Sequence, residues 1–181
     1  MVIGLFICAI TLHSIELFLM GQVIGFFQKK FFFNDTLGFI LAAFITSLFL
    51  GLGFLMGKFF APIIPDYSVW YAATILLVLG IKMFYSGIKH HKAKQLINPL
   101  EIKGLIALAI LSGLNAFFIG VAFGLLQLVN AFIYLSFLLF LCAIFFGYFE
   151  GFKRKKLPSR RFEFLSGAFY MIIAIVVVTF F

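Results

Sequence analysis

Charged residues are scarce in this sequence, and their scarcity decides the class of protein. Only 11% of the 181 residues are Asp, Glu, Lys or Arg, whereas 65% are hydrophobic and 29 are Phe. A soluble domain has about a quarter charged and about half apolar residues. A chain of this length has too little interior to hide so much apolar surface from water. The composition therefore excludes a water-soluble globule and predicts an integral membrane protein.

Cysteine is also scarce, which bears on redox chemistry. Cys8 and Cys142 are the two cysteines of the chain, and neither a CxxC pair nor a Cys/His spacing typical of a zinc site is present. A membrane thiol–disulfide carrier needs paired cysteines at equivalent repeat positions, and these two are not so placed, which disfavours that function. Because both lie within apolar runs, we expect them to be small, buried hydrophobic side chains.

A nucleotide-binding loop is lacking as well. The segment GLGFLMGKFF (51–60) has the look of a P-loop, but its spacing is wrong and Phe59 stands where Ser or Thr is required. No hydrophilic connection is long enough to form a catalytic domain in water. We therefore expect that the chain is not an enzyme and that it holds no resident cofactor.

Long apolar runs are what the sequence has in abundance. They are continuously apolar rather than alternating, which favours transmembrane helices over a membrane β-barrel. The first run is too long for a signal peptide and lacks its basic start, so we expect a retained helix. The predicted fold class is all-α, a polytopic membrane protein with a single transmembrane domain over 1–181. The six predicted helices cover about 3–27, 37–60, 69–88, 104–126, 129–150 and 162–180.

Basic residues gather at one end of the predicted helices. The opposite connections contain Lys58 alone, and this asymmetry follows the positive-inside rule. It predicts a multi-pass membrane protein with the basic end in the cytoplasm and both termini outside, and the expected location is a bacterial inner membrane. Nucleic acid is not an expected partner, because no folded, water-exposed module surrounds the basic run. We expect Glu150 to pair with basic neighbours such as Lys153, and Lys82 to extend toward the same basic end. The basic connections contain Lys29, Lys30, Lys89, Lys92, Lys94, Lys103, Lys153, Arg154, Lys155, Lys156, Arg160 and Arg161.

The two halves of the chain resemble each other. SIELFLMG (14–21) aligns with GLNAFFIG (113–120) at an offset of 99, and GFLMG (53–57) aligns with GYFEG (147–151) at an offset of 94. Each half has three helices, and because three is odd the second half enters the membrane from the opposite side. This predicts two inverted repeats, about 1–88 and about 104–181, joined by a cytoplasmic linker at about 89–103. The GxxxG pairs also fit ordinary small residues of membrane helices.

A candidate cation site lies near the middle of the first and fourth predicted helices. A central acid such as Glu16 costs about 2.5–3.5 kcal/mol in a membrane and commonly marks a transport path. His13 shares the helix face of Glu16, and Ser112 shares that of Asn115. Carboxylate, amide and hydroxyl oxygens suit a hard divalent ion such as Mn²⁺, and an imidazole makes the site softer. The predicted metal ligands are Glu16, Asn115, Ser112, His13 and Glu163. A purely structural hydrogen bond from Glu16 to a neighbouring helix stays an alternative.

These residues resemble those of the MntP-like manganese efflux pump family, within the LysE-type exporters. That family carries a motif like S-[IL]-D-A-[FL]-A-V-G in helices one and four, where this chain reads SIELFLMG and GLNAFFIG. Helix six of the family is similar to AELLGGLVLI, and FEFLSGAFYM keeps Glu163 and Gly167. Helix three, LLVLGIKMFYSGIK, also resembles the family's pattern. Glu16 and Asn115 stand where the family has two membrane aspartates, so the chain resembles a divergent member.

The resemblance implies a secondary active exporter of a divalent metal cation, expected to be Mn²⁺ as transported substrate. Expelling a divalent cation against 100 mV costs about 4.6 kcal/mol, so a driving force is needed. With no P-loop, exchange for protons at a midplane site is the expected source. The expected partners are the cation, protons and the lipid bilayer, and a homo-oligomer is left open. Alternatives are an exporter of a small organic solute such as an amino acid, or a divergent member that transports nothing.

Overall fold

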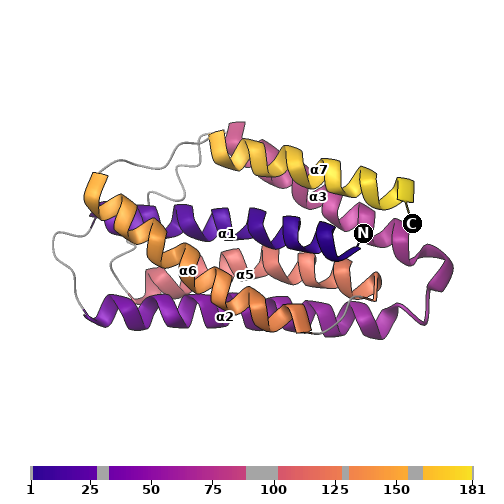
Figure 1. Ribbon diagram of the computed structural model, residues 1–181, viewed down its shortest axis with the longest axis horizontal. Helices are drawn as coiled ribbons and strands as arrows, with labels where there is room; N and C mark the ends of the chain where they lie inside the picture. Colours follow the sequence, from indigo (N-terminus) through magenta and orange to yellow (C-terminus); the bar gives the residue numbers. More distant parts are fainter. Residues whose placement is uncertain (1, 28–32, 89–101, 128–130, 155–160, 181) are drawn as a thin grey trace.

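The computed structural model describes residues 2–27, 33–88, 102–127, 131–154 and 161–180 (Figure 1). Over these residues the protein is almost wholly helical, which confirms the all-α prediction. A short 3-10 helix, η1 (Pro65–Tyr67), precedes α3. The α-helices of the described residues are α1 (Val2–Phe27), α2 (Phe33–Phe60), α3 (Ser68–Ile88), α5 (Ile102–Leu125), α6 (Ala131–Arg154) and α7 (Arg161–Phe180).

The lengths of these helices fit a membrane protein. Five helices of the described residues are long and apolar enough to cross a bilayer, and α7 adds a shorter apolar stretch, Phe164–Phe180. At 1.5 Å per residue that stretch is about 25 Å long, close to the thickness of the hydrocarbon layer. The prediction of a polytopic membrane protein is therefore confirmed.

Two helices extend beyond the predicted apolar runs. The sequence predicts a start near 37 and an end near 150, but α2 begins at Phe33 and α6 ends at Arg154. The prediction followed the apolar runs, and a helix can continue through polar residues that end such a run. In α6, Glu150 Oε1 lies 2.6 Å from Arg154 Nε one turn later, an ion pair that supports the last turn. The partner of Glu150 is thus a basic neighbour, as expected, although it is Arg154 rather than Lys153.

Successive helices alternate in direction, and both chain termini lie at the same end of the bundle (Figure 1). Lys58 lies in the last turn of α2 at this end, whereas Lys153 and Arg154 end α6 at the other end. Which end faces the cytoplasm stays a prediction. The other predicted basic positions and the linker 89–103 fall largely outside the described residues, namely at 28–32, 89–101 and 155–160.

Glycines bring the helices together in pairs. A Cβ at Gly21 of α1 would clash with the backbone of Ile144 in α6, and a Cβ at Gly120 of α5 would clash with the backbone of Leu50 in α2. The offset of 99 converts Gly21 to Gly120, and the offset of 94 converts Leu50 to Ile144. The two contacts are therefore equivalent by the offsets found in the sequence. This equivalence and the opposite directions of α1 and α5 support the inverted repeat, which stays a prediction.

The GxxxG pairs are contact points between helices. Gly53 of α2 lies against the backbone of Phe117 in α5, and Gly147 of α6 lies against the backbone of Phe18 in α1. The third helices of the two halves, α3 and α7, also pack on each other, and a Cβ at Gly80 would come within 2.9 Å of Gly167 O. Small residues permit such close approach, from which helix association in lipid draws van der Waals contact.

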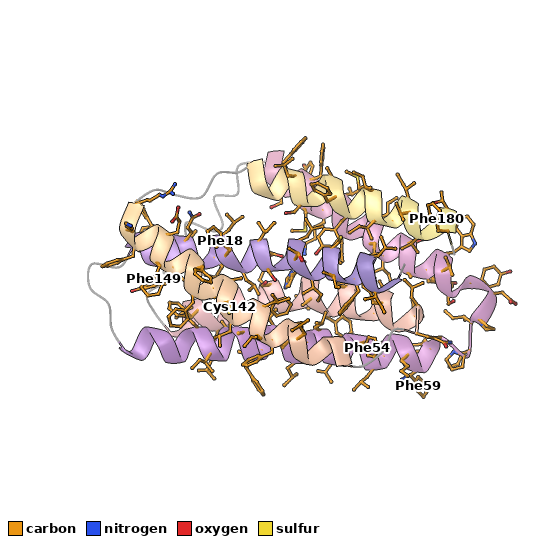
Figure 2. The ribbon with its side chains drawn as sticks, viewed as in Figure 1. Phe18, Phe54, Phe59, Cys142, Phe149 and Phe180 are labelled. Carbon is orange, nitrogen blue, oxygen red and sulfur yellow. The ribbon has the colours of Figure 1, made fainter. Side chains whose placement is uncertain are left out.

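The outer surface of the bundle is apolar. Phe59 and Phe180 are 69% and 67% exposed, whereas Phe54 lies inside at 1% (Figure 2). The prediction that both cysteines are buried is wrong, because Cys8 in α1 and Cys142 in α6 are exposed. These helices are hydrophobic all round, so an apolar neighbourhood in sequence does not separate a lipid-facing position from a core position.

Candidate functional site

The structure brings Glu16 and Asn115 into direct contact near the middle of α1 and α5. Asn115 Nδ2 donates hydrogen bonds to both carboxylate oxygens of Glu16, at 2.9 Å to Oε1 and 3.2 Å to Oε2. Asn115 is buried, and the Glu16 side chain is 20% exposed. Two residues 99 positions apart thus form one polar centre inside a largely apolar bundle.

Lys82 of α3 completes this centre, and the sequence does not predict it there. Its Nζ donates to Asn115 Oδ1 at 2.5 Å. The orientation of the amide follows from charge, because an ammonium only donates and an ionised carboxylate only accepts. Asn115 therefore turns its oxygen to Lys82 and its nitrogen to Glu16. The expectation that Lys82 extends to the basic end is wrong for this structure, since its ammonium turns inward toward a polar partner.

His13 lies one turn before Glu16 on the same face of α1. Its Nδ1 is 3.2 Å from Glu16 Oε2, but the contact lacks hydrogen-bond geometry, and neither ring nitrogen has a hydrogen-bond partner among the described residues. The side chain is only 1% exposed, and its ring packs edge-on against Phe140 of α6 at 5.2 Å. A buried polar group without a partner is costly, so these nitrogens are available for an additional ligand.

Ser112 holds the corresponding place on α5, one turn before Asn115. It is buried, and its Oγ has no hydrogen-bond partner within the described part of the chain. Because α1 and α5 run in opposite directions (Figure 1), one turn back along each helix leads toward opposite ends of the bundle. His13 therefore lies on the terminus side of the Glu16–Asn115 pair, and Ser112 lies on the side of Arg154.

A buried tyrosine fixes α7 beside this centre. Tyr170 is fully buried, and its hydroxyl donates to the carbonyl oxygen of Ala9 in α1 at 2.9 Å. Ala9 lies one turn before His13, so the bond positions α7 along the half of α1 that leads to Glu16. The hydroxyl is already committed to the backbone, which makes Tyr170 a positioning residue rather than a ligand.

Glu163, the remaining predicted ligand, opens α7, and its side chain lies outside the described residues. No group of three His, Cys, Asp or Glu side chains that could hold a metal ion occurs among the described residues. What the described atoms provide is two carboxylate oxygens, an amide oxygen in contact with an ammonium, and an imidazole, with a hydroxyl one helical turn from the amide. Of these donors, the carboxylate and amide oxygens suit a hard divalent ion and the imidazole suits a softer one.

Comparison with known proteins bears on what this centre serves. Residues 34–178 match the family model described as "Putative manganese efflux pump". A protein of Methanospirillum hungatei named "Putative manganese efflux pump MntP" is 32% identical over 146 residues, covering 75% of this chain and 76% of the relative. Proteins of the same name from Rippkaea orientalis and Crocosphaera subtropica are 27% and 28% identical and cover 85% and 82% of this chain, and 83% and 80% of their own lengths. No solved structure matches the chain.

Proposed function

The chain belongs to the putative manganese efflux pump family, and from this premise we propose that it exports a divalent metal cation, Mn²⁺, by proton exchange at the Glu16–Asn115 centre. The family is one of transporters, so the chain is a transporter and not an enzyme, as the sequence predicts. The metal is a transported substrate in this proposal, and no resident cofactor takes part.

The observation that carries the proposal is the pairing of a membrane-buried carboxylate with unsatisfied ligand atoms. Glu16 lies next to Asn115, and the ring nitrogens of His13 and the Oγ of Ser112 are buried without hydrogen bonds in the described structure. A stable protein ordinarily satisfies such groups. A passing cation would give each of them a partner in turn, which supports transport over a purely structural role for these side chains.

The order of the ligands along the bundle favours a path through the centre. We place the cytoplasm at the end that carries Lys153 and Arg154, because the positive-inside rule applies there. A cation leaving the cell would then meet Ser112 first, Glu16 and Asn115 next, and His13 last. Manganese accepts oxygen ligands and tolerates imidazole, so this sequence of donors suits it.

Proton exchange would supply the driving force. Export of a divalent cation against 100 mV costs about 4.6 kcal/mol before any concentration gradient. A carboxylate binds either a cation or a proton, so Glu16 can alternate between them and couple the two flows. Protonation removes the charge of Glu16, so the side chain releases a bound cation when it takes up a proton.

A second candidate is export of a small zwitterionic solute such as an amino acid. Lys82 and Glu16 lie at opposite sides of Asn115 and offer one positive and one negative charge. A solute that carries both an ammonium and a carboxylate is complementary to such a pair. Competition by amino acids in the manganese assay described next separates the two candidates.

The proposal is tested by Mn²⁺ uptake into inside-out proteoliposomes of purified protein with an acidic interior. We expect uptake by wild type that ceases when the pH gradient is abolished. Glu16→Gln should reduce uptake to the level of empty vesicles, because the amide cannot bind a proton in exchange. Glu150→Gln is the matched control and should transport like wild type, since Glu150 pairs with Arg154 at the end of α6. Full uptake by Glu16→Gln would contradict the proposal.

A further inference from the structure

We infer that the Lys82 ammonium is a tethered counter-cation of the site, which a transported cation must displace before Asn115 can bind it. The inference rests on the proposed function, because it concerns how the substrate enters the same centre. Its basis is the contact of Lys82 Nζ with Asn115 Oδ1 at 2.5 Å. That oxygen is the atom of the Asn115 side chain with lone pairs for a metal ion, since the amide nitrogen is a donor.

Among the described residues, an ionised Glu16 and the Lys82 ammonium balance each other in charge in the absence of a substrate. Glu16 contributes one negative charge, Lys82 contributes one positive charge, and Asn115 links them by hydrogen bonds to both. A divalent cation at Glu16 with Lys82 still in place would leave two positive charges uncompensated, whereas one remains if Lys82 withdraws. Like charges repel strongly where water is excluded. Binding of the ammonium and binding of the divalent cation at Asn115 therefore exclude each other.

Lys82 is placed so that it can leave without unpacking the core. The residue is exposed on the outside of α3, while its ammonium turns inward. Its four-carbon stem is flexible, and it stands six residues before the end of α3 at Ile88, about 9 Å along the helix. The close contacts between α3 and α7 involve Gly80 and Phe84 on α3, and neither is made by the Lys82 side chain.

The Lys82 ammonium at this place would discriminate between transported cations by their charge. A monovalent ion that displaces the ammonium from Asn115 replaces one positive charge by another and gains no net attraction to Glu16. A divalent ion gains one further unit of attraction to the carboxylate. Lys82 therefore acts as a specificity-determining residue that favours divalent over monovalent cations and weakens the apparent affinity for both.

The test is a titration of purified, full-length protein with Mn²⁺, in which the electron paramagnetic resonance signal of free Mn²⁺ reports binding. Lys82→Met keeps the length of the side chain and removes its charge, and we expect it to bind Mn²⁺ about tenfold more tightly or better. Na⁺ should compete with Mn²⁺ in Lys82→Met and not in wild type. Lys82→Arg should restore wild-type affinity, and Lys58→Met, the matched loss of charge far from the centre, should leave it unchanged.

The outcomes separate this inference from the proposed function. Equal affinity of wild type and Lys82→Met overturns the inference and leaves manganese export standing. Weaker binding by Lys82→Met also overturns it, because Lys82 would then hold the site together rather than compete for it. If Lys82→Met does not fold, Lys82→Gln carries the same expectation. Absence of Mn²⁺ binding in every folded variant would overturn the inference and the proposed function together.

Discussion

The two halves of the molecule use equivalent contacts for packing and different side chains at the centre. Gly21 and Gly120 make the same kind of backbone contact with helices that are related by the offset of 94. At the centre the first half supplies a carboxylate and an ammonium, Glu16 and Lys82, whereas the described residues of the second half supply the neutral Asn115 and Ser112. Val176 stands where the same offset places the counterpart of Lys82. These glycine contacts are therefore alike in the two halves, whereas the polar side chains at the centre differ.

The largest effect is expected where packing is broken. Gly120→Ala and Gly21→Ala each drive a Cβ into the backbone of the facing helix, and a backbone cannot move aside like a flexible side chain. We expect each to lower Tm by about 2–12 °C, from an overpacking cost of about 1–3 kcal/mol. Thermal unfolding in detergent, followed by circular dichroism, measures this.

Gly4→Ala is the control for these two variants, because nothing lies within 4 Å of a Cβ at Gly4. Alanine favours a helix by up to about 1 kcal/mol over glycine, so Gly4→Ala should leave Tm unchanged or raise it slightly. Similar losses at Gly21 and Gly120 would support equivalence of the two interfaces. A loss at one position alone would break the comparison between the halves.

The next effect concerns restoring a second acid to the centre. Asn115→Asp places a carboxylate beside Glu16, so a divalent cation between the two is fully neutralised. We expect about a tenfold gain in Mn²⁺ affinity, measured by the same resonance titration. Asn115→Ala is the companion variant and should bind more weakly than wild type. An Asn115→Asp protein that folds and binds Mn²⁺ no better would contradict the expectation that a second acid at this position strengthens the site.

A smaller effect is expected from His13. His13→Phe removes two buried nitrogens that lack hydrogen-bond partners in the described structure and keeps an aromatic ring against Phe140. The free energy of unfolding should be unchanged or higher, because a buried polar group without a hydrogen-bond partner destabilises the fold. Mn²⁺ affinity should fall by about threefold to tenfold. A variant that loses stability and keeps affinity would assign His13 a structural role.

The helices and their approximate ends could be predicted from the sequence, because a span of about 20 apolar residues is set by the bilayer. Which side of each helix faces the core and which faces lipid could not be predicted. An apolar run looks alike on its lipid side and its core side, which is why Cys8 and Cys142 were expected inside and lie outside. The glycine pairs were informative because two backbones can approach closely only where a Cβ is missing. Gly53 and Gly147 do lie at such close contacts between helices.

The centre could be predicted in part. Glu16 and Asn115 could be paired through the repeat, and the structure places them in hydrogen-bond contact. Lys82 could not be placed, because it has no counterpart in the second half and its partner is 33 residues away. A lone ammonium inside an apolar helix was the available signal, since such a group needs a partner within the bundle. Because many lysines lie at the basic end of the bundle, the Lys82 side chain was expected to extend toward that end instead.

The most direct measurement of whether Glu16 and Asn115 act as one cation site is a double-mutant cycle on Mn²⁺ binding. Glu16→Gln, Asn115→Ala and the double variant are compared with wild type, and each is checked for folding by its thermal transition. If both side chains hold the same ion, Glu16→Gln and Asn115→Ala each weaken Mn²⁺ binding, and the double variant weakens it by less than the sum of the two losses. Wild-type Mn²⁺ affinity in folded Glu16→Gln would contradict a cation site at this centre.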